Sequence, residues 1–85
     1  MKLKILCQVV EQGPDGSYFV QYGIFKASIR PAPVTPNEWW WELIIVGGKY
    51  AIRQGGVNDP AKAAEDIDQA AKEVIGQMSV LKGCL

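Results

Sequence analysis

The chain has 85 residues, and its nine Lys and Arg residues balance nine Asp and Glu residues, so its net charge is zero. It contains no His, which excludes an imidazole base or a His metal ligand, and no apolar run is long enough to cross a bilayer. The hydrophobic fraction of 48% is typical of a globular protein, and the length predicts a single domain over residues 1–85.

The first two predicted strands cover residues 2–11 and 17–29. Apolar side chains alternate with other residues along 2–11, which predicts a half-buried strand with Cys7 as a small core residue. The turn-forming run Gly13–Gly16 follows. Aromatic and β-branched residues in 17–29 favour a second strand, hairpin-paired with the first. Either alternate set of its side chains is apolar enough for the core, so the outward face of this strand stays open.

The next two predicted strands cover residues 39–46 and 49–54. Three prolines make residues 30–38 a stiff loop before them. Gly47-Gly48 predicts a tight hairpin turn because glycine adopts positive φ at no steric cost. Folding about these glycines pairs Val46 with Lys49 and places Glu42 opposite Arg53 as an ion pair on the outer face.

A C-terminal helix is predicted over residues 60–82. Asp59 is suited to the N-cap and Pro60 to the first helical position. An apolar stripe recurs every three or four residues from Ala63 to Leu81. The fold class is therefore α+β: a four-stranded, mainly antiparallel sheet in the order ββ–loop–ββ, with one amphipathic helix packed on one face.

Three consecutive tryptophans, Trp39 to Trp41, are the most unusual feature of the sequence. Neighbouring residues of a strand point to opposite faces, so Trp39 and Trp41 can face the helix while Trp40 faces away. Trp40 then either packs under the proline loop or anchors an interface, where tryptophan is enriched.

Two sets of candidate binding residues follow from this sheet. A protein partner would contact its outer face and the loop from Pro33 to Glu38, through Trp40, Glu42, Ile44, Lys49, Arg53 and Glu38. A single-stranded nucleic acid would instead use aromatic and basic side chains, namely Phe19, Phe25, Lys26, Trp40 and Arg53. The zero net charge makes the nucleic acid the less favoured partner. A homodimer contact on the same face is the third alternative.

No nucleophile has a recognisable base, no residues have the spacing of a metal or phosphate site, and no cofactor is expected. The chain is therefore interpreted as a non-enzyme. Cys7 and Cys84 could form a disulfide, but reduced cysteines in a cytoplasmic protein are the favoured interpretation.

Two resemblances bear on function. The segment from Trp39 through Gly47-Gly48 and Gly55-Gly56 to Asp59-Pro60-Ala61 resembles small phage- or prophage-encoded proteins, some of which are anti-CRISPR inhibitors. The strand order resembles Whirly-type single-stranded DNA binders. The helix is similar to the last helix of double-stranded RNA-binding domains, but it lacks their basic cluster and is net acidic.

The resemblance to phage proteins implies a non-enzymatic inhibitor that binds a host protein complex, such as a CRISPR effector, and blocks it sterically. Such an inhibitor would act in the host cytoplasm. The alternatives are a single-stranded nucleic-acid-binding domain and a homodimeric accessory protein.

Overall fold

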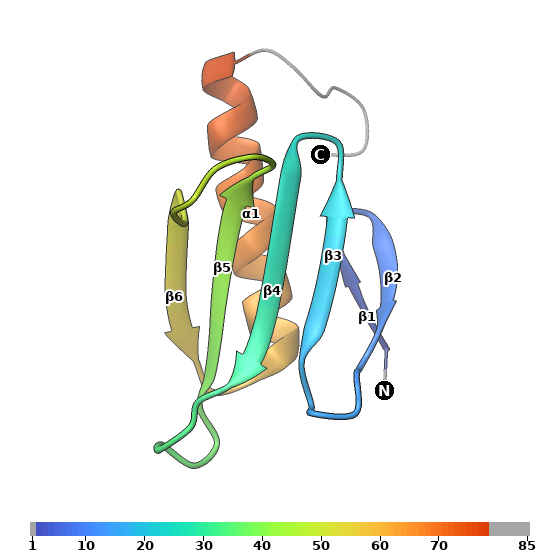
Figure 1. The fold of residues 1–85 in the computed structure, drawn as a ribbon, viewed down its shortest axis with the longest axis vertical. Helices are drawn as coiled ribbons and strands as arrows, with labels where there is room; N and C mark the ends of the chain where they lie inside the picture. Colours follow the sequence, from blue (N-terminus) through green and yellow to red (C-terminus); the bar gives the residue numbers. More distant parts are fainter. Residues whose placement is uncertain (1, 79–85) are drawn as a thin grey trace.

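The computed structural model describes residues 2–78. A four-stranded antiparallel sheet forms its centre, with strands in sequence order: β3 (Tyr18–Tyr22), β4 (Phe25–Pro31), β5 (Trp39–Ile45) and β6 (Arg53–Val57). The helix α1 (Pro60–Met78) lies across one face of this sheet, and no other helix or strand within residues 2–78 covers the opposite face (Figure 1). The predicted α+β class with one helix on one face of an antiparallel sheet is confirmed.

Residues 2–11 form two strands rather than the predicted one. β1 (Lys2–Ile5) and β2 (Gln8–Glu11) are an antiparallel pair in a sheet of their own, beside β3 (Figure 1). The chain reverses at Leu6 and Cys7, whose φ angles are 50° and 66°. Neither residue is a typical turn former, so the alternating pattern continues through the turn and conceals it.

Tertiary contacts hold this turn in place. Leu6 is fully buried, and its backbone N–H donates to Oδ1 of Asp68 on α1 at 2.8 Å. A positive φ is costly for a leucine, and burial of its side chain together with this charge-assisted hydrogen bond offsets the cost.

Residues 17–29 likewise contain a hairpin where one strand was predicted. The chain turns at Gly23 and Ile24, and Tyr22 pairs with Phe25 on either side of them. Gly23 has a φ of 60°, which glycine adopts without strain. The four-stranded sheet is therefore completed by β3 and β4, while the predicted first strand contributes nothing to it.

The predicted hairpin at Gly47-Gly48 is wrong in length and register. Residues 46–52 form a longer loop, and β6 begins only at Arg53. The Val46 N–H donates to the Ile24 carbonyl at 2.8 Å, so the chain beyond β5 is held by the β3–β4 turn instead of by a returning strand. Leu43 pairs with Arg53, one residue away from the predicted pairing with Ile52. Glu42 consequently faces Gln54 rather than Arg53.

The start of the helix agrees with the sequence pattern. Asp59 Oδ1 accepts a hydrogen bond from the Ala61 N–H at 3.0 Å, as an N-cap residue does, and Pro60 is the first helical residue. The buried helix positions lie at three- and four-residue spacing: Ala63, Ala64, Ile67, Ala70, Ala71 and Val74. The predicted extension to residue 82 falls outside the described residues. No helix within 2–78 is both long and apolar enough to cross a membrane.

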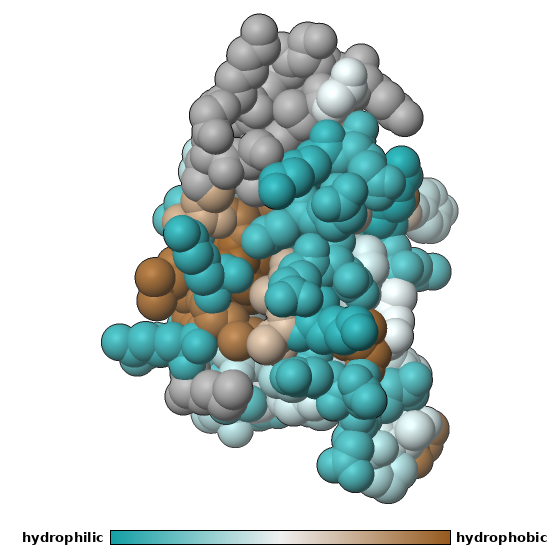
Figure 2. Space-filling view, turned by 180° about the vertical axis from the view of Figure 1, so that it is seen from behind, coloured by the Kyte–Doolittle hydropathy of each residue, from teal (hydrophilic) through white to brown (hydrophobic). Residues whose placement is uncertain are grey.

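The core lies between α1, the inner sheet face and the β1–β2 hairpin. Trp41 is buried and Trp39 packs against the cluster, as predicted for these two tryptophans. Seen from the helix side, Figure 2 shows hydrophilic side chains over the exposed part of α1 and apolar side chains beside it, toward the β1–β2 hairpin. Val9 of this hairpin is 72% exposed.

The structure also corrects the interpretation of Cys7. This residue is half-buried in the β1–β2 turn and is disulfide-bonded, so it is neither a strand residue nor a reduced thiol. Cys84 lies outside the described residues. Disulfides are typical of oxidising compartments. The argument for a cytoplasmic location from reduced cysteines is therefore lost, and that location stays a prediction.

Candidate functional site

The uncovered face of the four-stranded sheet is the candidate site. Strand alternation and register place the side chains of four strands on it: Phe19, Gln21, Lys26, Ser28, Arg30, Trp40, Glu42, Ile44 and Gln54. Tyr18, Val20 and Tyr22 face the core, which resolves the open question about residues 17–29. Trp40 is 40% exposed, so it is not sealed beneath its own chain. We call this surface the outer face.

A shallow groove crosses the outer face around Trp40. Its volume is about 380 Å³. It is lined by side chains and backbone of β4, β5 and β6 and the residue preceding β5, namely Arg30, Glu38, Trp40, Trp41, Glu42, Gln54, Gly55 and Gly56. Of the two glycines in the edge strand β6, Gly56 faces the groove, whereas Gly55 faces inward toward Trp41.

Glu38 and Trp40 form one wall of the groove. The Trp40 indole N–H (Nε1) donates to Oε2 of Glu38 at 3.3 Å. A Cβ on Gly56 would lie 3.3 Å from Glu38 Oε1 and 3.5 Å from Trp40 Cδ1, so both side chains reach over this glycine. The proline loop positions Glu38, because the Ala32 N–H donates to the Glu38 carbonyl at 2.9 Å and closes the loop.

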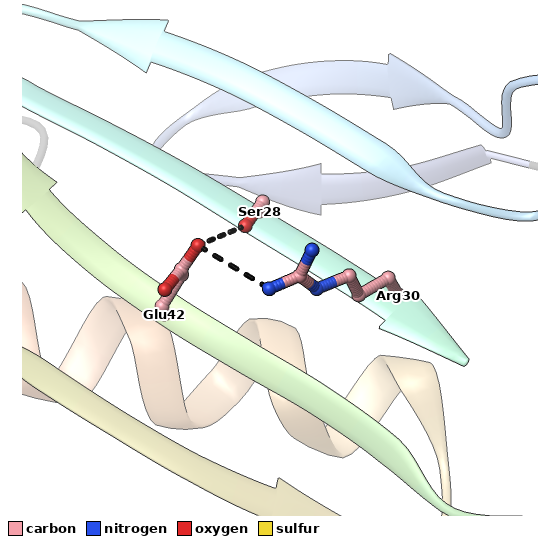
Figure 3. Close-up of polar contacts among 3 residues, drawn as sticks. All are labelled: Ser28, Arg30 and Glu42. Carbon is pink, nitrogen blue, oxygen red and sulfur yellow. Dashed lines mark hydrogen bonds and ion pairs between the residues drawn. The ribbon is translucent and has the colours of Figure 1, made fainter. Parts of the chain in front are cut away.

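A second polar cluster lies where β4 and β5 pair. Oε1 of Glu42 accepts a hydrogen bond from the Ser28 hydroxyl at 3.4 Å and lies 3.8 Å from Nη2 of Arg30 (Figure 3). The Arg30 side chain is 57% exposed and that of Glu42 31% exposed. Solvent weakens such a pair, which is worth at most about 1 kcal/mol. The pair matters for the charge of the groove, because the Arg30 guanidinium that lines it already has the Glu42 carboxylate beside it.

The structure brings together only part of the predicted partner-binding set. Trp40, Glu42 and Glu38 line the same groove, whereas Ile44 lies on the outer face beyond it. Lys49 is in the loop 46–52 rather than in a strand. Arg53 pairs with Leu43, whose side chain faces the core, and its guanidinium Nη1 donates to the Ile52 carbonyl at 2.8 Å. The one-residue difference in register therefore removes Arg53 from the outer face.

The predicted nucleic-acid set is not gathered at one place. Phe25 is fully buried in the core, and Arg53 belongs to the opposite side of the sheet. Phe19, 65% exposed, and Lys26 line a separate shallow hollow of about 180 Å³, which does not include Trp40. A continuous strip of aromatic and basic side chains, which would follow a nucleic-acid strand, is therefore missing from residues 2–78.

Sequence reasoning missed five groove residues: Arg30, Trp41, Gln54, Gly55 and Gly56. The glycines were interpreted as the end of a strand, although they are inside β6. The pairing that brings them beside the tryptophans depends on a register that the two-glycine hairpin did not predict. Trp41 pairs with Gly55, and a large indole beside a strand glycine is typical of close side-chain packing.

Comparisons with protein-family models, curated proteins and solved structures gave no match. The candidate site is therefore interpreted from its own residues and geometry.

Proposed function

We propose that this chain is a small, non-enzymatic interaction module that binds a protein partner through the groove on its outer face. The observation that carries the proposal is the partly exposed indole of Trp40 beside an open groove on an uncovered sheet face. A partner that covered Trp40 would remove a large apolar surface from water, and tryptophans in this situation often dominate binding energy.

The chemistry of the groove supports recognition rather than catalysis. Its polar groups are carboxylates, a guanidinium and an amide, while hydroxyl or thiol nucleophiles are missing from its lining within residues 2–78. Under this proposal, a host defence complex would be inhibited by occlusion of the surface that the groove contacts. The identity of that partner rests on the resemblance to phage proteins.

Replacement of Trp40 by alanine tests the proposal. We expect Trp40→Ala to weaken capture of the partner from host lysate by about 30-fold, the equivalent of a 2 kcal/mol hot spot. Tyr50→Ala is the matched control, because Tyr50 is an 83% exposed aromatic residue in the loop 46–52, away from the groove. Circular dichroism should show an unchanged fold for both variants.

Three results would contradict the proposal. Equal capture by the Trp40→Ala variant and the parent would mean that the groove does not take part in binding the partner. A dimer by light scattering that dissociates in this variant would assign the outer face to self-association. Salt-dependent binding of oligonucleotides would restore the nucleic-acid alternative.

A further inference from the structure

The charges around the groove do not balance. Arg30 lies beside Glu42, and the Glu38 carboxylate accepts a hydrogen bond from the indole N–H of Trp40. The ion pairs among residues 2–78 are Lys2–Glu11 and Arg30–Glu42, so the Glu38 carboxylate has no cationic partner in the described part of the chain. The three ionised groups of the groove therefore carry a net charge of one negative unit.

The unbalanced carboxylate lies next to an aromatic ring. Glu38 Oε1 and Trp40 Cδ1 both approach the position that a Gly56 Cβ would occupy, so this glycine allows the carboxylate and the ring to lie together over β6. β6 is the last strand of the sheet, so no further strand closes the groove on that side. A side chain of a bound protein can therefore approach from the β6 edge and meet the indole and the carboxylate together.

We propose that the groove binds an arginine side chain of the protein partner. A guanidinium is planar, stacks on an indole face through a cation–π interaction, and donates paired hydrogen bonds to a carboxylate. Trp40 supplies the ring, Glu38 the carboxylate, and Gln54 an amide carbonyl within the same groove. This inference rests on the proposed function and specifies the chemistry of its partner.

An acidic ligand group fits the groove less well. Among the groove residues that the structure describes, Arg30 alone could pair with such a ligand, and it is already 3.8 Å from Glu42; the ligand would also face the unbalanced charge of Glu38. Like charges placed together in an interface oppose binding. The groove therefore distinguishes a basic side chain from an acidic one.

Nuclear magnetic resonance of the intact chain tests the inference. The probes are acetyl-Gly-Arg-Gly-amide and the same peptide with citrulline, which has nearly the same shape without the charge. We expect the arginine peptide to shift the resonances of the Trp40 indole N–H and the Gly56 amide, and the citrulline peptide to leave them unchanged. A glutamate peptide should also leave both resonances unchanged.

A charge-removing substitution locates the contact. Glu38→Gln keeps an oxygen that can accept the indole hydrogen bond, so the groove should keep its shape. We expect it to weaken binding of the arginine peptide by about tenfold, because the charge-assisted hydrogen bonds are lost. Glu73→Gln, on an exposed helix position, is the control and should leave the affinity unchanged.

The inference is overturned if the arginine peptide leaves both resonances unshifted, if citrulline or glutamate shifts them equally, or if Glu38→Gln binds the arginine peptide as well as the parent does. These results are independent of the Trp40→Ala capture experiment. If Trp40→Ala abolishes capture but the peptides give any of these results, the interaction function stands and the arginine assignment is wrong. Failure of both experiments would reject the groove as a recognition site.

Discussion

Tyr18 is a single residue whose chemistry is changed by its place in the fold. Its side chain is fully buried in the core, and its hydroxyl has no hydrogen-bond partner within residues 2–78. Burial raises the pKa of the Tyr18 phenol above its ordinary value of 10.0, because the apolar surroundings disfavour the charged phenolate. The hydroxyl therefore costs stability at neutral pH and increasingly so in alkali.

Removal of this hydroxyl should stabilise the protein. We expect Tyr18→Phe to raise the free energy of unfolding at neutral pH by about 1 kcal/mol, since an unpaired buried hydroxyl is no longer present. Urea unfolding followed by circular dichroism measures this difference. Tyr50→Phe is the control and should change stability by less than about 0.5 kcal/mol. A destabilised Tyr18→Phe variant would mean that the hydroxyl is hydrogen-bonded in solution.

The same residue predicts a pH dependence. In the unfolded chain Tyr18 loses its proton near the ordinary pKa of 10.0, whereas the folded chain retains it to higher pH. Ionisation of Tyr18 therefore leaves stability unchanged well below pH 10.0 and lowers it as the pH rises from there through the raised pKa of the folded chain. Unfolding curves across this range should decline less steeply for Tyr18→Phe than for the parent.

At the scale of elements, the packing of β6 against β5 requires a glycine at position 55, because the Trp41 indole lies against it. A Cβ on Gly55 would lie 2.9 Å from Trp41 Nε1 and 3.1 Å from two ring carbons. Trp41 is itself buried, so its ring has little room to move away. The packing of β5 on β6 therefore depends on the missing side chain at Gly55, which faces the core side of the sheet.

Alanine at two different glycines should have opposite effects. We expect Gly55→Ala to lower the free energy of unfolding by about 1–3 kcal/mol through overpacking against Trp41. Gly76→Ala should raise it by about 0.5–1 kcal/mol, because a Cβ there meets no atom within 4 Å and alanine favours helix. Thermal unfolding of both variants checks the signs. A neutral Gly55→Ala would show that the Trp41 ring can shift at little cost.

At the scale of the whole molecule, the β1–β2 hairpin and the four-stranded sheet are separate sheets that the helix joins. α1 contacts β1 as well as β4, β5 and β6. One polar bond in this arrangement links positions 62 residues apart in the sequence, from the Leu6 N–H to Asp68. Loss of this bond would leave a buried backbone donor in a turn that is already strained at Leu6 and Cys7.

Two aspartates of the helix provide a matched test. We expect Asp68→Ala to lower the free energy of unfolding by about 1–2 kcal/mol more than Asp66→Ala, because only Asp68 accepts the Leu6 bond. Both substitutions change helix propensity equally, so the difference isolates the hydrogen bond. Hydrogen exchange should show the larger loss of protection in β1 and β2. Equal effects of the two variants would mean that the turn does not depend on Asp68.

The sequence by itself determined the features that depend on local spacing. The cap at Asp59, the apolar stripe from Ala63, and the inward placement of Trp39 and Trp41 follow from periodicity and hydrogen-bonding chemistry within a few residues. The outward placement of Trp40 follows from the same alternation. Glu38 and Glu42 are two residues to either side of it, so the candidate site was predictable on β5.

Only the tertiary structure decided where the other strands meet β5. The turn at Leu6 and Cys7 has no local signal, because burial and Asp68 stabilise it from elsewhere in the fold. The β5–β6 register differs by one residue from the two-glycine hairpin, because the chain after Ile45 bonds to the β3–β4 turn before β6 begins. Since a shift of one residue reverses the face of every side chain in a strand, long-range contacts determined that Arg53 left the groove and Gly56 entered it.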